Sequence, residues 1–394
     1  MTGARIVWIK QLGTAGEDDA YSIAVTDDDR IYLAGYTSGS LAGENAGGND
    51  AWLAQYDADG NQRWLCQLGG AGDDEANGVA VSPSGQIYII GYTYNTPPET
   101  TNGDRYTAAW LARYDAQGNR HWYRDLGTTV PQIATSLAIA PDGTLYITSY
   151  TAPEHDDWQV WLGRYAADGE ELWRRSLGYH SEEIVAYVAV GRTGQVYLVS
   201  NALSPLATIS EPPVWLACYN EVGEPQWHHA IGSIDETSCS GIAVDADENI
   251  YVAGFSDRPT TDHRCAWLAK YDRHGQPLWQ QDLGSIEDEE STGIAVDAAG
   301  NAYLAGFTYG AIAGENAGDA DAWVACYSPD GTLSWAQQIG TEGEDGCNAV
   351  AVDAKGRVYV AGYTDSALDG DHAGDYDAWL AKLEFRTATQ SSEF

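Results

Sequence analysis

The sequence repeats itself seven times. A glycine that follows an apolar residue recurs at intervals of 51 to 58 residues, and a tryptophan stands five residues before each of these glycines. A second tryptophan series runs through the same units, and the two series together hold 14 of the 15 tryptophans. Self-similarity at this period indicates stacked copies of one supersecondary unit. The repeated glycines are Gly13, Gly69, Gly127, Gly178, Gly232, Gly284 and Gly340.

Each unit contains four short segments rich in β-branched and aromatic residues, which is typical of strands. In the first unit these segments are residues 22–25, 31–36, 51–56 and 64–68. Tight links join the first segment to the second and the third to the fourth, and they predict antiparallel hairpins.

Most of these links end in glycine, as in Pro83-Ser84-Gly85, and glycine suits the left-handed position of a short hairpin loop. Asp29 and Glu248 take that position in two units. We expect local strain or a shifted turn at both.

Seven four-stranded antiparallel units predict an all-β protein, a seven-bladed β-propeller that forms a single domain over residues 1–385, with 386–394 as a flexible tail. The chain begins with a segment of the fourth-strand type and stops after one of the third-strand type. We therefore expect the N-terminal strand to complete the last blade and close the ring. The expected blade units are about 13–69, 69–127, 127–178, 178–232, 232–284, 284–340, and 340–383 with 5–12.

Several motifs recur together: Gly-Tyr-Thr, Asp-Ala-Trp-Leu-Ala, Tyr-Asp-x-x-Gly, Trp-x-x-x-Leu-Gly and Gly-Ile-Ala-Val-Asp. From about Trp8 to Leu383 the chain thereby resembles the SBBP family of bacterial seven-bladed propeller repeats. The resemblance implies a fold and not a chemistry, and it implies possible export. The sequence as given shows no signal peptide, because strand-like sequence begins at Arg5. The cellular location stays open.

The charge balance excludes some partners. Asp and Glu total 58 against 20 Lys and Arg, a net charge of -38, which repels phosphate backbones and anionic lipids. The chain also lacks an apolar run long enough to span a bilayer. We therefore expect no nucleic-acid or membrane partner, and a monomer.

Strand direction places function at one end of the propeller. Both hairpins of a blade fall on one face, which we call the hairpin face. The crossings between blades and the loops between second and third strands fall on the other, which we call the loop face. Long loops on a rigid scaffold commonly carry binding. We expect the loop face to recognise a protein or glycan partner, and loop aromatics such as Tyr309 and Tyr376 are ligand candidates.

Carboxylates recur in the crossings: six of the seven units have one directly before the first strand, and five have one at the next position. They predict a broken acidic ring around the channel mouth, which attracts cations. Alternatively, each carboxylate caps backbone N–H groups within its own crossing. The candidate binding residues are Glu17, Asp18, Asp73, Asp74, Glu182, Glu183, Glu236, Asp288, Glu289, Glu344 and Asp345.

A second acidic set lies in the loops between second and third strands. Hard oxygen ligands at this density suit Ca²⁺ or another divalent cation better than zinc or copper. The candidate metal ligands are Glu44, Asp50, Glu315, Asp319, Asp321, Asp371, Asp375 and Asp377.

Histidines and carboxylates gather in one sector of the third unit. His155, Asp157, His180 and Glu182 are the candidate catalytic residues for a lyase or hydrolase, provided that they converge on one pocket. The alternative is a solvated polar loop.

The recurring tryptophans allow two interpretations. They either fill the contacts between blades or offer platforms on which sugars stack, as in lectin-like propellers. Six cysteines do not follow the repeat and are expected to be core fillers or free thiols, with a Cys239–Cys265 bridge as an alternative.

Taken together, these patterns favour a non-catalytic binding scaffold that uses its acidic loop face, with Ca²⁺ ordering the long loops. A carbohydrate-binding propeller and a lyase or hydrolase are the alternatives.

Overall fold

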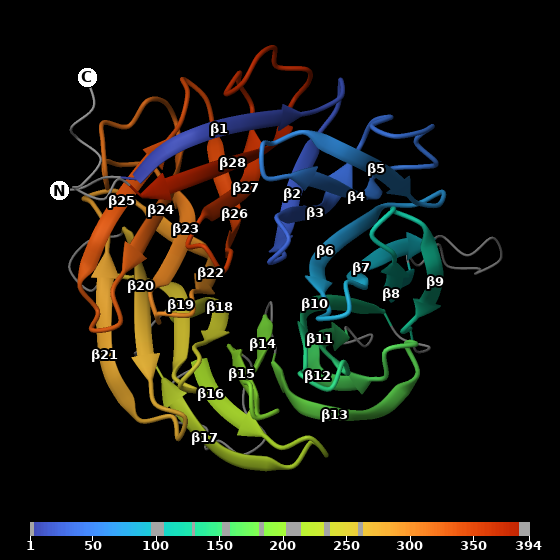
Figure 1. Ribbon diagram of the computed structural model, residues 1–394, viewed down its shortest axis with the longest axis vertical. Helices are drawn as coiled ribbons and strands as arrows, with labels where there is room; N and C mark the ends of the chain where they lie inside the picture. Colours follow the sequence, from blue (N-terminus) through green and yellow to red (C-terminus); the bar gives the residue numbers. More distant parts are fainter. Residues whose placement is uncertain are drawn as a thin grey trace.

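The computed structural model describes residues 4–95, 106–127, 131–151, 158–180, 185–201, 214–231, 237–258 and 263–385. This part of the chain contains 28 strands, which form seven four-stranded antiparallel sheets around a central axis (Figure 1). The protein is thus a seven-bladed β-propeller, as the repeats predict. Over these ranges no helix is long and apolar enough to cross a membrane.

The blades follow one another in chain order, and the first strand of each lies next to the axis (Figure 1). Blade 1 consists of β2 (Asp18–Val25), β3 (Arg30–Thr37), β4 (Asp50–Asp57) and β5 (Gln62–Leu68). Blade 2 consists of β6 (Asp74–Val81), β7 (Ile87–Asn95), β8 (Tyr106–Tyr114) and β9 (Arg120–Asp125). Blade 3 consists of β10 (Gln132–Ile139), β11 (Leu145–Thr151), β12 (Trp158–Tyr165) and β13 (Glu171–His180).

The remaining blades repeat this order. Blade 4 consists of β14 (Ala186–Val190), β15 (Val196–Ser200), β16 (Val214–Tyr219) and β17 (Pro225–Ile231). Blade 5 consists of β18 (Thr237–Val244), β19 (Ile250–Asp257), β20 (Arg264–Tyr271) and β21 (Pro277–Leu283). Blade 6 consists of β22 (Glu289–Val296), β23 (Ala302–Thr308), β24 (Asp321–Tyr327) and β25 (Leu333–Ile339). Blade 7 consists of β26 (Asp345–Val352), β27 (Val358–Thr364), β28 (Asp377–Phe385) and the N-terminal β1 (Ala4–Leu12).

The two ends of the chain meet in blade 7. Strand β1 pairs antiparallel with β28 from Ala4 opposite Phe385 to Leu12 opposite Ala378, with a bulge between Ile6 and Trp8. In Figure 1, β1 runs along the outer side of β28. The predicted closure of the ring by the N-terminal strand is therefore confirmed, and it covers the edge that β28 would otherwise expose.

Tryptophans fill the contacts between blades. Trp52 on a third strand is only 1% exposed. Trp64 on a fourth strand packs against Tyr32, with ring centroids 6.1 Å apart, and its Nε1 donates to the Ala116 carbonyl of the next blade at 3.0 Å. Gly118 of that blade sits on the Trp64 ring, where a side chain would collide with it. The packing interpretation holds for these residues, because large aromatic area is buried at each boundary.

Asp29 and Glu248 adopt left-handed backbone conformations, with φ of 68° and 65°. The expected strain is present, but the turn is not shifted, because each N–H still donates to the carbonyl three residues before it. Both side chains reach the preceding blade. Asp29 binds Lys355 at 2.7 Å, and Glu248 Oε1 accepts a hydrogen bond from Thr193 N at 2.9 Å. These contacts offset the cost of φ above zero for a residue with a Cβ.

All six cysteines are free, and Cys239 and Cys265 are both buried. The alternative prediction of a disulfide between Cys239 and Cys265 is therefore wrong. They act as small apolar residues within the sheets, and burial raises the pKa of the Cys239 thiol to about 12.

Candidate functional site

A cavity of about 260 Å³ opens where blades 7 and 1 meet on the loop face. In Figure 1 the strands that border it, β2 and β3 in blue and β26 to β28 in red, lie next to one another. Its walls combine three carboxylates with three phenol rings. They are Glu17, Asp19, Tyr36, Glu344, Tyr363 and Tyr376.

Backbone pairing holds the two sides of this cavity together. Glu17 and Tyr376 form an isolated parallel bridge between blades, and Asp18 N donates to the Tyr376 carbonyl at 2.8 Å. The Tyr376 hydroxyl donates to Glu344 Oε2 at 2.9 Å, so the tyrosine is fixed over the cavity. This hydrogen bond to a carboxylate raises the pKa of Tyr376 to about 12.

Asp19 lies at the base of the cavity and is 8% exposed. Burial raises its pKa to about 8, and the negative charges of Glu75 and Glu17 add to the effect. Asn348 Nδ2 from blade 7 donates to Asp19 Oδ1 at 2.8 Å. This raised pKa indicates a partly dry cavity with negative charges around it, where a bound cation would gain most.

Paired aromatic rings complete the walls. Tyr36 packs against Tyr21 with centroids 5.4 Å apart, and Tyr363 packs edge-on against Tyr376 at 5.5 Å. The faces of such rings attract cations. Carboxylates and phenol rings together suit an ammonium or guanidinium group.

The predicted acidic ring divides into two structural kinds. At its second position, Asp18 Oδ2 accepts hydrogen bonds from Thr14 N and Oγ1 at 2.5 and 2.8 Å, and Asp345 accepts the same pair from Thr341 at 2.6 and 2.7 Å. Asp74 accepts from Gly70 N at 2.7 Å, and Glu289 accepts from the Ser285 hydroxyl. These four side chains brace the crossings in which they lie.

The first position of the ring is mixed. Asp73 Oδ1 accepts from Asn49 N at 3.1 Å and Asp288 Oδ1 from Arg264 N at 2.7 Å, so both hold the loop of the preceding blade. Among the first-position carboxylates that the structure describes, Glu17 and Glu344 are the ones that line the cavity. Glu182, Glu183 and Glu236 lie outside the described residues.

The candidate metal ligands of the loops do not come together. Glu44, Glu315, Asp319, Asp371 and Asp375 are exposed, and within the described ranges no three His, Cys, Asp or Glu side chains form a group suited to a metal ion. Asp50, Asp321 and Asp377 differ, because each is 1% exposed at the start of a third strand.

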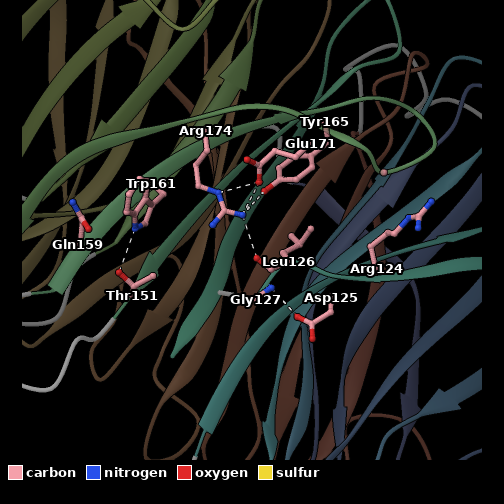
Figure 2. Close-up of a pocket in the computed structure, with 11 residues that line it drawn as sticks. Arg124, Asp125, Leu126, Gly127, Thr151, Gln159, Trp161, Tyr165, Glu171 and Arg174 are labelled. Carbon is pink, nitrogen blue, oxygen red and sulfur yellow. Dashed lines mark hydrogen bonds and ion pairs between the residues drawn. The ribbon is translucent and has the colours of Figure 1, made fainter. Parts of the chain in front are cut away.

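A second hollow, of about 590 Å³, lies between blades 2 and 3 (Figure 2). Figure 2 shows Arg174 bound to Glu171, Tyr165 and the Leu126 carbonyl, at 2.7, 3.3 and 3.2 Å. Trp161 Nε1 donates to Thr151 Oγ1 at 3.2 Å. These polar groups of the hollow therefore satisfy one another.

Most of the candidate catalytic sector lies outside the described residues. His155, Asp157 and Glu182 are in that part of the chain. The backbone of His180 pairs with that of Trp158 at the end of β13. Their convergence on one pocket stays a prediction.

Sequence reasoning singled out Glu17, Glu344 and Tyr376 but missed Asp19, Tyr36 and Tyr363. Tyr36 and Tyr363 belong to the recurring Gly-Tyr-Thr motif, which was interpreted as strand only. The sequence did contain a signal for these two tyrosines. The Gly-Tyr-Thr motif places an aromatic residue at the loop-face end of the second strand, near the expected channel mouth.

The fold and the cavity define the class of the protein: a seven-bladed β-propeller with an acidic, tyrosine-lined cavity on its loop face. The beta-propeller repeat described as SBBP matches residues 7–42, 63–97 and 334–368. The chain thus carries SBBP beta-propeller repeats, as its motifs predict.

Among curated proteins, the regulatory protein FlaEY of Caulobacter vibrioides is 24% identical over 195 residues, which are 41% of this chain and 20% of that protein. The chain therefore spans about a fifth of that relative's length.

Solved propellers of several kinds share the fold. An ulvan lyase of a new polysaccharide lyase family has a TM-score of 0.54 at 10% identity, covering 96% of this chain and 98% of that chain. Puromycin hydrolase has a TM-score of 0.53 at 14% identity, covering 90% of this chain and 54% of that one. This chain thus spans about half of the hydrolase. At such identity the likeness shows the fold alone.

Proposed function

We propose that this protein is a binding scaffold whose loop face takes a positively charged segment of a protein partner, with a lysine or arginine side chain seated in the cavity between blades 7 and 1. The observation that carries the proposal is the convergence of Glu17, Asp19 and Glu344 with three tyrosine rings. Carboxylates pair with the charged head, and the rings contact its flanks.

The charge of the whole molecule supports this assignment. A net charge of -38 steers basic partners toward the protein and repels acidic ones. Asp19, whose pKa of about 8 keeps it largely protonated at neutral pH, loses its proton as a cation approaches. Binding of a basic segment is therefore expected to release protons.

The test is titration calorimetry with a lysine-rich peptide at fixed ionic strength and with a chelator present. Glu344→Gln removes one cavity charge and leaves the Tyr376 hydroxyl only a neutral amide oxygen as acceptor, and we expect it to weaken binding about tenfold. Glu170→Gln is the matched control, because Glu170 is exposed in a turn of the hairpin face.

Affinity should be unchanged in Glu170→Gln. Equal losses in both variants would mean non-specific attraction to an acidic surface, and an unchanged affinity in Glu344→Gln would remove the cavity from the binding site. Either result contradicts the proposal.

A further inference from the structure

In the part of the chain that the structure describes, three blade boundaries each contain a pair of buried aspartates. One begins the third strand of a blade, and the other begins the first strand of the next blade. Their exposed fractions are 0 or 1%, apart from 6% at Asp74. The pairs are Asp377 with Asp18, Asp50 with Asp74, and Asp321 with Asp345.

The two carboxylates of a pair contact the same two consecutive residues after the fourth strand. One packs against the glycine, and the other accepts a hydrogen bond from the next backbone N–H. Asp377 Oδ1 fills the place where a side chain on Gly13 would lie, while Asp18 Oδ2 accepts from Thr14 N. Asp50 and Asp74 repeat this arrangement at Gly69 and Gly70, and the third pair repeats it at Gly340 and Thr341. This packing gives a physical reason for glycine at the recurring position in these blades.

Donors satisfy one oxygen of each third-strand aspartate. Asp377 Oδ2 accepts from Gln11 Nε2 at 2.7 Å and from Ala373 N at 2.9 Å, and the other two blades repeat the pattern. The other oxygen has no donor. By hydrogen-bond geometry, five buried oxygens in the three pairs lack a partner: Oδ1 of Asp18, Asp50, Asp321, Asp345 and Asp377. The Thr37 and Thr364 hydroxyls lie beside Asp18 and Asp345 and lower the pKa of each carboxyl in part.

Two buried carboxylates side by side are costly without a counter-charge. Burial raises the pKa of Asp18, Asp74 and Asp345, and repulsion from the paired aspartate raises each further. No Lys, Arg or His of the described ranges forms an ion pair with any of the six aspartates.

The boundary between blades 5 and 6 lacks such a pair and can be compared with the three boundaries that have one. Cys265 stands where the third-strand aspartate would be, and Glu289 begins β22. Here the Arg258 guanidinium enters, with Nη2 3.7 Å from Glu289 Oε2 and Nη1 bound to the Ser285 carbonyl. Nη2 also lies against Gly284, the glycine of this turn. Where one carboxylate is missing, the chain supplies its own cation at the same place.

We propose that each of the three aspartate pairs binds one hard cation of the Ca²⁺ type between adjacent blades. The unpartnered carboxylate oxygens are its ligands, and the Thr37 hydroxyl beside Asp18 is a further oxygen within reach. One of these sites joins blade 7 to blade 1, so that cation binding strengthens the closure of the ring. This inference goes beyond the proposed function and does not depend on it.

The experiment uses chelator-treated full-length protein and titrates it with CaCl₂ by calorimetry, without peptide. We expect about three ions per chain and a higher Tm in Ca²⁺. Asp50→Asn and Asp377→Asn preserve side-chain shape, and each should lower the stoichiometry by one. Asp59→Asn is the matched control, because Asp59 is an exposed residue of a hairpin turn.

A gain-of-site variant provides the converse test. Cys265→Asp combined with Arg258→Ala recreates the aspartate pair at the boundary of blades 5 and 6, and the stoichiometry should rise to four. Absence of Ca²⁺ binding in the unmodified protein would overturn the proposal. So would equal stoichiometry in Asp50→Asn, Asp377→Asn and Asp59→Asn, and neither result depends on the gain-of-site variant folding.

Discussion

Adjacent residues of one crossing have different roles, as Asp18 and Asp19 show. Asp18 is turned into the boundary between blades, where it holds Thr14. Asp19 points to the other side of β2 and lines the cavity, because successive side chains of a strand alternate. In this crossing Asp18 therefore braces the blade boundary, whereas its neighbour Asp19 lines the cavity.

Asp19 should make stability depend on pH. Its pKa is about 8 in the folded protein and near the ordinary 3.8 in the unfolded chain, so the folded state holds one more proton between these pH values. The free energy of unfolding therefore falls as pH rises, by up to about 1.4 kcal/mol per pH unit. Asp19→Asn should remove this contribution, which denaturant unfolding between about pH 5 and pH 8 would measure.

The control for this variant is Asp59→Asn. Its free energy of unfolding should depend on pH as that of the unmodified protein does over the same range. Parallel pH profiles for Asp19→Asn and the unmodified protein would contradict the raised pKa.

At the scale of elements, three loops on the loop face are each held by the same pattern of hydrogen bonds. In blades 1, 6 and 7, a fourth-strand glutamine binds both the buried aspartate and the backbone of the loop. In blade 7, Gln11 Oε1 accepts from Leu368 N at 2.9 Å and Asp369 N at 3.1 Å. The N-terminal strand thereby closes the ring and also orders the loop next to the cavity.

Gln11→Ala should destabilise the protein by about 2 to 3 kcal/mol, because it removes several hydrogen bonds and leaves the buried Asp377 with fewer donors. Hydrogen exchange at the Leu368 and Asp369 amides should accelerate selectively. Lys10→Ala removes only an exposed ion pair with Asp369, 3.3 Å long, and should cost less than about 1 kcal/mol. Equal effects of the two substitutions would contradict this role of Gln11.

For the whole molecule, the excess of negative charge opposes folding. The 58 acidic residues far outnumber the 20 basic ones, so most carboxylates repel other carboxylates. Ion pairs such as Arg5 with Glu384, 3.8 Å apart and exposed, contribute little. Self-repulsion of the compact state is therefore the dominant long-range electrostatic effect.

Added salt should stabilise the protein. Raising KCl from about 10 mM to about 150 mM shortens the screening length from about 30 Å to about 8 Å, which weakens repulsion across the propeller. We expect Tm to rise over this range in the presence of a chelator, as differential scanning calorimetry would show. A falling Tm would mean that surface ion pairs outweigh the repulsion.

Strand type, blade number and ring closure were all predictable from the sequence. Each depends on contacts within a repeat or between neighbouring repeats, and a pattern that recurs seven times reports those contacts directly. The backbone strain at Asp29 and Glu248 was predictable for the same reason, because a residue with a Cβ stands where other blades have glycine.

The candidate site was only partly predictable, because it exists where the ring closes. Glu17 and Tyr376 lie far apart in the chain, and they meet only when blade 1 packs against blade 7. The aspartate pairs likewise join the third strand of one blade to the first strand of the next. Sequence periodicity by itself determined what each blade is, since local patterning selects strands and turns. The tertiary structure alone decided which carboxylates face solvent, a cavity or one another, because burial and charge proximity depend on how the blades pack.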